Sequence, residues 1–533
     1  MVLSEKSRYL PDEVSDNAEQ NSPAKLTSGP QTPRLSAEQS LDQDSIRDLD
    51  IERNASLDGD AAATARDEFE VWWEEPADQD PENPLNWTNT RKIITIITIS
   101  FVTFLTPLAS SMFAPGVPNV LDEFNTDSEA IATFVVSIFV LGFAFGPLIV
   151  APCSELYGRN VVYHVCNIFF VVFTICNAVS TNIGMLLAFR FLAGFAGVGA
   201  VTIGSGTISD MIPAKRRGLA MSCWSLGPLF GPVIGPIAGG YLTESAGWRW
   251  VFWVITIAAG ISTVACFFIL KETYADTILT KKAERLRKKT GNPAWHPRLT
   301  SKTAGKQLIK ESFARPMQIL LFSPVASLMC FYIATLYGLL YILFTTFTFV
   351  FVDQYDFSTG SAGLSYLGSG VGTVAGLFVS ASFSDFKVRR KLAMNQEPQP
   401  EDRLPWFMVL PGSLSIPVGF LIYGWGAHYR VHWIVPQIGT AVIGFSVIII
   451  LMCIQTYLVD TYNHHAASAI AASTILRNLL GALLPLSGLS IYDGLGLGWG
   501  NTLFGLLALC AAPIPMLFGM FGERLRNRAM VTR

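Results

Sequence analysis

Long apolar stretches occupy most of the sequence after residue 90 and constrain the fold more than any other feature. Half of the 533 residues are hydrophobic and 15% are charged, against about a quarter charged in soluble proteins. A helix of roughly 20 residues crosses the ~30 Å of hydrocarbon in a bilayer. The sequence therefore predicts an all-α integral membrane protein with twelve transmembrane helices. The stretches lie near residues 93–115, 129–150, 160–180, 184–209, 218–242, 249–270, 322–352, 360–384, 405–425, 431–459, 466–490 and 500–522.

Charge separates the first 85 residues from the rest. Residues 1–85 contain 21 acidic and 7 basic side chains, and they have too few large apolar groups to offset the entropy lost on folding, so we expect a disordered acidic tail. Of the other 31 Lys and Arg residues, 27 fall in segments on the side of the N-terminus, and two, Arg249 and Arg430, fall on the opposite side. By the positive-inside rule both termini are cytoplasmic.

A basic loop at 271–316 divides the stretches six and six. The loops after the second and the eighth stretch share a spacing, which suggests two parallel six-helix repeats. Each has a small residue, an acid four positions on and an arginine four further on: Ala151, Glu155 and Arg159, then Ala381, Asp385 and Arg389. The predicted parts are a tail at 1–85, a bundle at 86–270, a cytoplasmic linker at 271–316, a second bundle at 317–522 and a cytoplasmic tail at 523–533.

Several motifs occur in a recognisable order. They are ENPLNW before the first stretch, GPLIVAPCSELYGRNVVY after the second, RFLAGFAG in the fourth, GPLFGPVIGPIAGGYL in the fifth, WRWVFW at the sixth and ASAIAASTILRNLLGALLPL at the eleventh. Over about 86–522 the chain resembles the major facilitator superfamily, and within it the fungal twelve-span drug:proton antiporters. The resemblance implies a major facilitator fold of two six-helix bundles that alternate access, and export driven by protons.

The loop between the second and third stretches contains Glu155, Gly158 and Arg159. The i, i+4 spacing lets Glu155 pair with Arg159 on a helical turn, and Gly158 permits a backbone reversal. The resemblance implies that Glu155 also faces the start of the eleventh helix, near Ala466, and latches the two halves. It implies the same gating role for Asp385 and Arg389. The alternative is a solvated loop that only fixes topology.

Two arginines, Arg190 and Arg477, lie inside apolar stretches. An unpaired charge near a helix centre costs about 2.5–3.5 kcal/mol even on an insertion scale, so both should face protein or water. The resemblance makes Arg190 the residue that couples proton binding to substrate movement. The alternative for Arg190 is an anchor that reaches the membrane surface. Arg477 is either a second coupling charge in the cavity or a strut between helices.

Glycine and proline alternate along the fifth stretch. Gly227, Gly231, Gly235 and Gly239 recur every four residues beside a matching proline series. Glycines permit close helix approach, so we expect a tight seam between the halves, against a glycine face of the eighth stretch at Gly368, Gly372 and Gly376. The resemblance makes this the antiporter helix, with Gly231, Pro232, Gly235, Pro236, Gly239 and Gly240 as its site residues.

Superfamily architecture would place a substrate cavity at mid-membrane between the halves. The candidates on its lining helices are Ser110, Ser111, Ser205, Tyr337, Tyr341, Phe344 and Gln455. Tyr337 and Tyr341 share a helix face and, with Phe344, would stack on flat or apolar ligands. The alternative is that this aromatic stripe packs in the core or faces lipid.

Other function classes find little support in the sequence. It has no Walker A motif, its eight cysteines stand singly, and the His464-His465 pair has no companion at metal-ligand spacing. We expect no enzyme activity, cofactor, metal or nucleic-acid partner. The favoured function is a monomeric, proton-coupled exporter of a small organic molecule, namely a drug, toxin or secondary metabolite, in the plasma membrane. The alternatives are a nutrient or polyamine facilitator or symporter, and a non-transporting transceptor.

Overall fold

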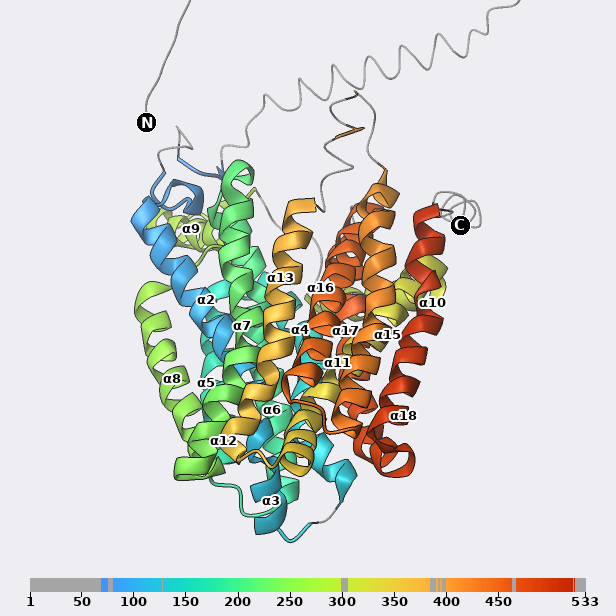
Figure 1. Ribbon diagram of the computed structural model, residues 1–533. Coiled ribbons are helices and arrows are strands. Elements are labelled where there is room, and N and C mark those ends of the chain that lie inside the picture. Colours follow the sequence, from blue (N-terminus) through green and yellow to red (C-terminus); the bar gives the residue numbers. More distant parts are fainter. Residues whose placement is uncertain are drawn as a thin grey trace, which may run out of the picture. The chain divides into compact units, whose positions relative to one another are not determined.

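The computed structural model describes residues 69–74, 80–126, 128–298, 305–383, 390–391, 394, 399–462, 466–520 and 522. These residues are almost entirely helical (Figure 1). Most of the predicted acidic tail lies outside the described residues. So do Asp385, Arg389 and the pair His464-His465.

Twelve long helices run through the described chain and correspond one to one with the predicted apolar stretches. The first six are α2 (Asn89–Ser111), α4 (Glu129–Leu156), α5 (Arg159–Ala178), α6 (Ile183–Met211), α7 (Ala214–Ala246) and α8 (Trp248–Ile269). The second six are α11 (Pro324–Tyr355), α13 (Leu367–Phe383), α15 (Trp406–His428), α16 (Ile434–Tyr462), α17 (Ala466–Leu483) and α18 (Gly488–Ala511).

By length and composition, ten segments of the described chain are apolar enough to cross a membrane. One of them, Ala466–Met520, contains both α17 and α18. The other helix that makes up the difference is α7, which is rich in glycine and proline instead of large apolar residues. The twelve predicted helices and the ten apolar segments therefore agree.

Shorter elements connect these helices. The helical ones are α3 (Val117–Glu123), α9 (Ala275–Thr290), α10 (Gly305–Phe322), α12 (Thr359–Ala362), η1 (Pro84–Asn86), η2 (Ala114–Gly116), η3 (Gly363–Tyr366), η4 (Pro400–Arg403) and η6 (Leu484–Ser487). Two short strands, β1 (Glu70–Val71) and β2 (His296–Pro297), pair in parallel with Glu70 opposite His296. In Figure 1, α9 lies at one end of the helices, while α3 and α12 lie at the other.

Close helix contacts depend on glycine. A Cβ atom at Gly194 of α6 would lie 2.1 Å from the Phe139 carbonyl oxygen of α4, and one at Gly372 of α13 would lie 1.9 Å from the Ala441 carbonyl oxygen of α16. Helices in lipid gain no hydrophobic free energy by associating, so backbone approach of this kind supplies the packing energy instead. A side chain at either position would separate its helix pair.

The structure differs from the predicted tail over residues 69–74 and 80–85, which together with residues 86–88 form what we call the N-terminal clamp. Its strand β1 pairs with β2 of the linker, and Asp80, only 3% exposed, accepts hydrogen bonds from the backbone amides of Glu74 and Glu82. Lys282 of α9 forms an ion pair with Asp80 at 3.3 Å. The average composition of residues 1–85 did not predict this ordered segment, because its apolar residues are few and lie close together, next to the basic linker in the fold.

The electrostatics of Asp80 follow from these contacts. Burial alone would raise the pKa of the Asp80 carboxyl, but the two backbone amides and Lys282 together hold it below its ordinary value. The clamp therefore contributes stability at neutral pH, and this contribution is lost as the pH falls through the lowered pKa.

We predict that Lys282→Met loosens the N-terminal clamp. The substitution leaves the buried Asp80 carboxylate without its cation, which should cost about 1–3 kcal/mol of local stability. Hydrogen exchange of the amides in 69–74 and in α9 should become faster. Lys281→Met is the matched control, because Lys281 is exposed on the same helix. Equal exchange in the two variants would show that the ion pair does not hold the clamp.

Candidate functional site

Arg190 of α6 lies inside the first half and is fully buried. Its Nε donates to the Val135 carbonyl oxygen at 2.7 Å. Its Nη2 donates to the carbonyl oxygens of Ser110 at 3.0 Å and Val136 at 3.4 Å. Its Nη1 donates to the Ala109 carbonyl oxygen at 3.5 Å. The last carbonyls of a helix lack intrahelical partners and carry partial negative charge, so the end of α2 is a suitable acceptor for a cation.

Three aromatic rings enclose the same guanidinium. Its Cζ atom lies 4.9 Å from the ring centroid of Phe113, 5.2 Å from that of Phe139 and 5.9 Å from that of Phe252. The structure shows no acidic partner for Arg190 among the described residues. This geometry excludes the alternative of an anchor at the membrane surface and makes Arg190 a junction of α2, α4 and α6.

The spacing of Glu155 and Arg159 predicted an ion pair between them, but Arg159 pairs with a different residue. Its Nε forms an ion pair with Asp210 of α6 at 3.3 Å, and its Nη1 donates to the Ser154 hydroxyl at 2.9 Å. The reason is that α4 ends at Leu156 and α5 begins at Arg159, so Glu155 and Arg159 are not on one helix and the i, i+4 geometry does not apply. The Glu155 side chain is exposed.

Glu272, which follows α8, is a residue of this site that the sequence analysis missed. Its carboxylate accepts from the backbone amides of Arg159 at 2.9 Å and Asn160 at 3.3 Å, at the start of α5. Gly158 has φ +91°, and a Cβ atom there would lie 2.3 Å from Glu272 Oε2. Gly158 is therefore required both for its backbone conformation and for space. The sequence signal that could have identified Glu272 is an acidic residue just after an apolar stretch, at the start of the basic segment 271–316.

The second half contains a counterpart of the Arg159–Asp210 pair. Arg403, just before α15, bonds to Asp460 near the end of α16 at 2.6 Å. By helix order, α15 and α16 occupy the places in the second half that α5 and α6 occupy in the first. This pair supports the predicted repeat independently of Arg389.

The glycine face of α7 does not form the seam that the sequence predicted. Cβ atoms at Gly231, Gly235 and Gly239 would contact α2 of the same half, at distances of 2.8, 2.5 and 1.8 Å. The glycine face of α13 likewise meets α16 of its own half. Sequence spacing shows that a face is suited to close contact but does not show which helix meets it.

The two halves meet along the neighbouring face of α7. A Cβ atom at Gly240 would lie 2.8 Å from the Thr359 carbonyl oxygen of α12. Glu244, near the end of α7, accepts from the Gly360 amide at 3.0 Å and from the Ser358 hydroxyl at 3.2 Å. Its carboxylate thus lies at the positive start of the helix that leads into α13, a favourable position for a negative charge.

A second seam between the halves joins α4 to α17 and α18. The Ser137 hydroxyl donates to the Ala482 carbonyl oxygen at 2.8 Å, and the Ser490 hydroxyl donates to Glu129 Oε2 at 2.9 Å. By helix order, the start of α4 and the end of α7, which carry Glu129 and Glu244, lie at the end of the bundle opposite α9. We call the contacts of Glu244 and Glu129 the carboxylate latches.

Most of the predicted cavity residues come together between these seams. The rings of Tyr337 and Tyr341 are 4.9 Å apart, those of Tyr341 and Phe344 are 5.6 Å apart, and Arg477 lies 4.8 Å above the Tyr337 ring. Tyr341 lies near Ser110 of the first half.

The other three predicted residues lie apart. Ser111 bonds to Pro107 of its own helix and to Gly231 of α7. Ser205 and Gln455 are half-buried on α6 and α16, and in the described structure neither is hydrogen-bonded to the aromatic rings or to Arg477.

The chain with these two six-helix halves matches a known protein family. The family model of the Major Facilitator Superfamily matches residues 99–485. The chain belongs to the major facilitator superfamily. It is accordingly a multi-pass membrane transporter and not an enzyme.

Several curated relatives of this major facilitator protein come from fungi. The MFS-type transporter penM of Penicillium rubens is 47% identical over 90% of this chain and 94% of its own length. The MFS-type transporter tndD of Aspergillus flavipes is 48% identical over 90% of this chain and 89% of its own. The efflux pump radE of Floropilus chiversii is 46% identical over 87% and 86%.

Solved structures confirm the fold of this transporter. A bacterial homologue of the human lysosomal transporter Spinster, in an inward-facing conformation, matches with a TM-score of 0.59 over 83% of this chain and 99% of that one, at 14% identity. The inward-open xylose transporter XylE from E. coli matches with a TM-score of 0.58 over 80% and 96%, also at 14% identity.

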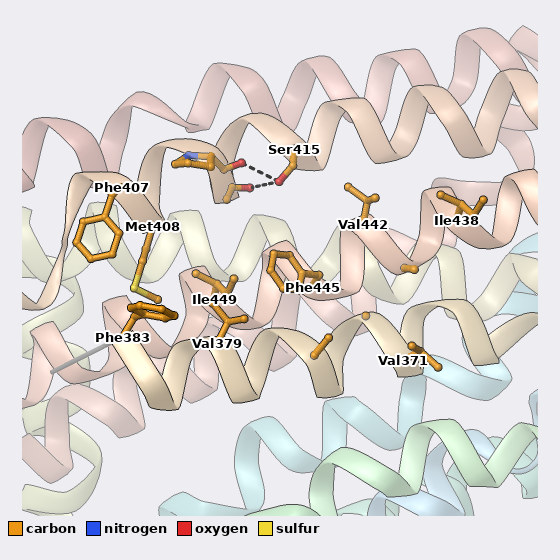
Figure 2. Close-up of a pocket in the computed structure, with 15 residues that line it drawn as sticks. Val371, Val379, Phe383, Phe407, Met408, Ser415, Ile438, Val442, Phe445 and Ile449 are labelled. Carbon is orange, nitrogen blue, oxygen red and sulfur yellow. Dashed lines mark hydrogen bonds between the residues drawn. The ribbon is translucent and has the colours of Figure 1, made fainter. Parts of the chain in front are cut away.

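A groove of about 750 Å³ lies away from the central residues of the transporter (Figure 2). It runs between α13 and α15 over α16, and its lining is almost wholly apolar, including Phe383, Met408 and Phe445. The Ser415 hydroxyl in its wall bonds back to the Pro411 carbonyl oxygen at 2.7 Å. With no free polar group on its walls, this groove suits hydrocarbon chains of the membrane better than a substrate that must be recognised by polar contacts.

We predict that Gly158→Ala destabilises the transporter more than Gly247→Ala does. Both positions have a similar positive φ, +91° and +88°, but nothing lies within 4 Å of a Cβ atom at Gly247. The control therefore reports backbone strain of about 1–2 kcal/mol, and the difference reports the clash with Glu272. Thermal unfolding of the purified proteins measures both. The double variant Gly158→Ala, Glu272→Ala should recover part of the difference, and equal midpoints for the two single variants would contradict the proposed role of Glu272.

We predict that Glu244→Ala loosens the contact between the halves at both seams. Loss of an ionised acceptor should cost about 1.5–3 kcal/mol at the α7–α12 contact. The readout is the rate of disulfide formation between cysteines placed at 129 and 490, which replace the second latch and report how closely α4 approaches α18, in a background where the exposed Cys223 and Cys510 are serine. The rate should fall about tenfold.

Ser245→Ala is the control for this measurement, because the Ser245 hydroxyl bonds only to the backbone of its own helix among the described residues. An unchanged rate in Glu244→Ala would mean that the two seams open independently.

Proposed function

We propose that this transporter exports a small organic molecule from the cytosol in exchange for protons. The observation that carries the proposal is the junction between the halves. Besides the packing of α4 on α17 and of α7 on α12, the halves are joined at one end by exchangeable polar contacts, the carboxylate latches and Ser137, with Arg477 and the aromatic rings of α11 next to the junction. Contacts of this kind can break and re-form at low cost, which alternating access requires.

The direction of transport is supported by the relatives. One protein 46% identical to this chain is named an efflux pump, and others at 47% and 48% are named MFS-type transporters. Proton coupling is supported by the resemblance to drug:proton antiporters and by Arg190, whose buried charge is held by carbonyls and rings alone among the described residues. Such a charge can favour or oppose protonation nearby without itself being neutralised.

The location follows from the same line of argument. We propose a monomer in the plasma membrane, with the end that carries α9 and both termini in the cytoplasm, because 27 of the 31 basic residues outside the tail lie in segments on that side. The carboxylate latches would then close the outer end. A membrane potential supplies about 2.3 kcal/mol per charge per 100 mV for the exchange.

We predict that Arg190→Ala abolishes transport driven by an imposed pH gradient in reconstituted vesicles. Arg190→Lys should be intermediate, because one ammonium group cannot reach carbonyls on both α2 and α4 as the planar guanidinium does. Substrate-dependent proton flux, read with an internal pH dye, is the measurement.

Arg249→Ala is the control, because Arg249 forms an ion pair with Glu123 at the far end of the bundle. Full gradient-driven transport by Arg190→Ala would remove Arg190 from the coupling. Uptake in place of extrusion would favour a nutrient symporter, and a protein that binds ligand without flux would favour a transceptor.

A further inference from the structure

Acidic side chains are confined to the helix ends of the described bundle. Each lies within about two turns of an end: Glu129, Glu155, Asp210, Glu244, Asp353, Asp460 and Asp493. Arg190 and Arg477 lie six or seven residues from an end of α6 and α17. No ion pair joins either arginine to a carboxylate among the described residues, so neither site has a carboxylate that would attract a cation.

The two arginines differ in their partners. The Arg190 guanidinium donates hydrogen bonds to backbone carbonyls and contacts aromatic rings within the first half. Arg477 is half-buried, lies over the Tyr337 ring at 4.8 Å and has no hydrogen-bond acceptor among the described residues, and its Nε is shielded from solvent. An anionic ligand would supply the acceptor that the shielded Nε lacks.

An aromatic surface adjoins this cation. The rings of Tyr337, Tyr341 and Phe344 follow one another along α11 at centroid distances of 4.9 and 5.6 Å, with interplanar angles of 45° and 66°. Gly481, one turn after Arg477 on α17, leaves room for the Tyr337 ring, because a Cβ atom there would lie 3.0 Å from it. The helices that carry this surface and Arg477, α11 and α17, both pack against α4 of the first half, so the site lies where the halves separate.

We propose that Arg477 and the three rings form the substrate-recognition site and that they select aromatic organic acids. A carboxylate, phenolate or enolate oxygen of the substrate would pair with the Arg477 guanidinium while its ring system packs against the tilted rings of Tyr337 and Tyr341. This inference rests on the proposed export function and adds the substrate class. The membrane potential supports it, since an anion leaving a negative cytosol moves downhill, whereas a cation would move uphill.

The test uses three probes with one ring system and different charges: 2-naphthoate, 2-naphthamide and 2-naphthylmethylamine. Binding to the purified full-length transporter should be at least tenfold tighter for naphthoate than for the other two. Arg477→Gln should remove this preference, and Arg477→Lys should keep part of it. Tyr337→Leu should weaken all three probes alike. Arg249→Gln, at an arginine outside the site, should leave the preference unchanged.

The outcomes separate the substrate class from the function. Equal binding of the three probes, preference for the amine, no binding of naphthoate, or an unchanged preference in Arg477→Gln would each overturn the inference. If Arg477→Gln does not fold, the wild-type preference and the Tyr337→Leu result decide. Export of the amide or amine by vesicles that do not export naphthoate would overturn the acid class and leave export standing. Binding of naphthoate without flux would overturn export and leave the recognition site standing.

Discussion

In hydrocarbon, every backbone amide must be hydrogen-bonded inside the protein, and this requirement governs the rest of the structure. It makes each spanning segment a helix and leaves side chains and helix ends as the places where polar interactions can differ. Arg190 shows the consequence most clearly. Its cation is accepted by carbonyls at the end of α2 and on α4, so one side chain joins three helices of the first half.

Carboxylates at helix starts are a recurring device in this transporter. Glu272 accepts from the first amides of α5 and fixes the loop after α4 within the first half. Glu244 accepts from the Gly360 amide of α12 and connects the two halves. The same charge–dipole interaction thus forms a permanent contact at Glu272 and, in the proposed mechanism, a reversible contact at Glu244.

The helix faces divide in a similar way. The glycine faces Gly231, Gly235 and Gly239 of α7 and Gly368, Gly372 and Gly376 of α13 bring backbones together inside each half. Between the halves, Gly240 and Gly370 allow close approach, and hydroxyl and carboxylate contacts add polar interactions that can be exchanged when the halves move. The Arg477 side chain and the rings of α11 lie next to this interface, so their exposure depends on it.

The sequence alone determined the twelve helices, the division into two halves, the superfamily and the interior position of Arg190, because helix length, hydropathy and motif order are local properties. It also grouped Tyr337, Tyr341 and Phe344, which share one helix face. Only the tertiary structure decided that Arg159 pairs with Asp210 and not with Glu155, that the glycines of α7 face α2, and that residues 69–74 and 80–88 bind the linker. These outcomes depend on which distant elements meet, and spacing along the chain carries no information about that.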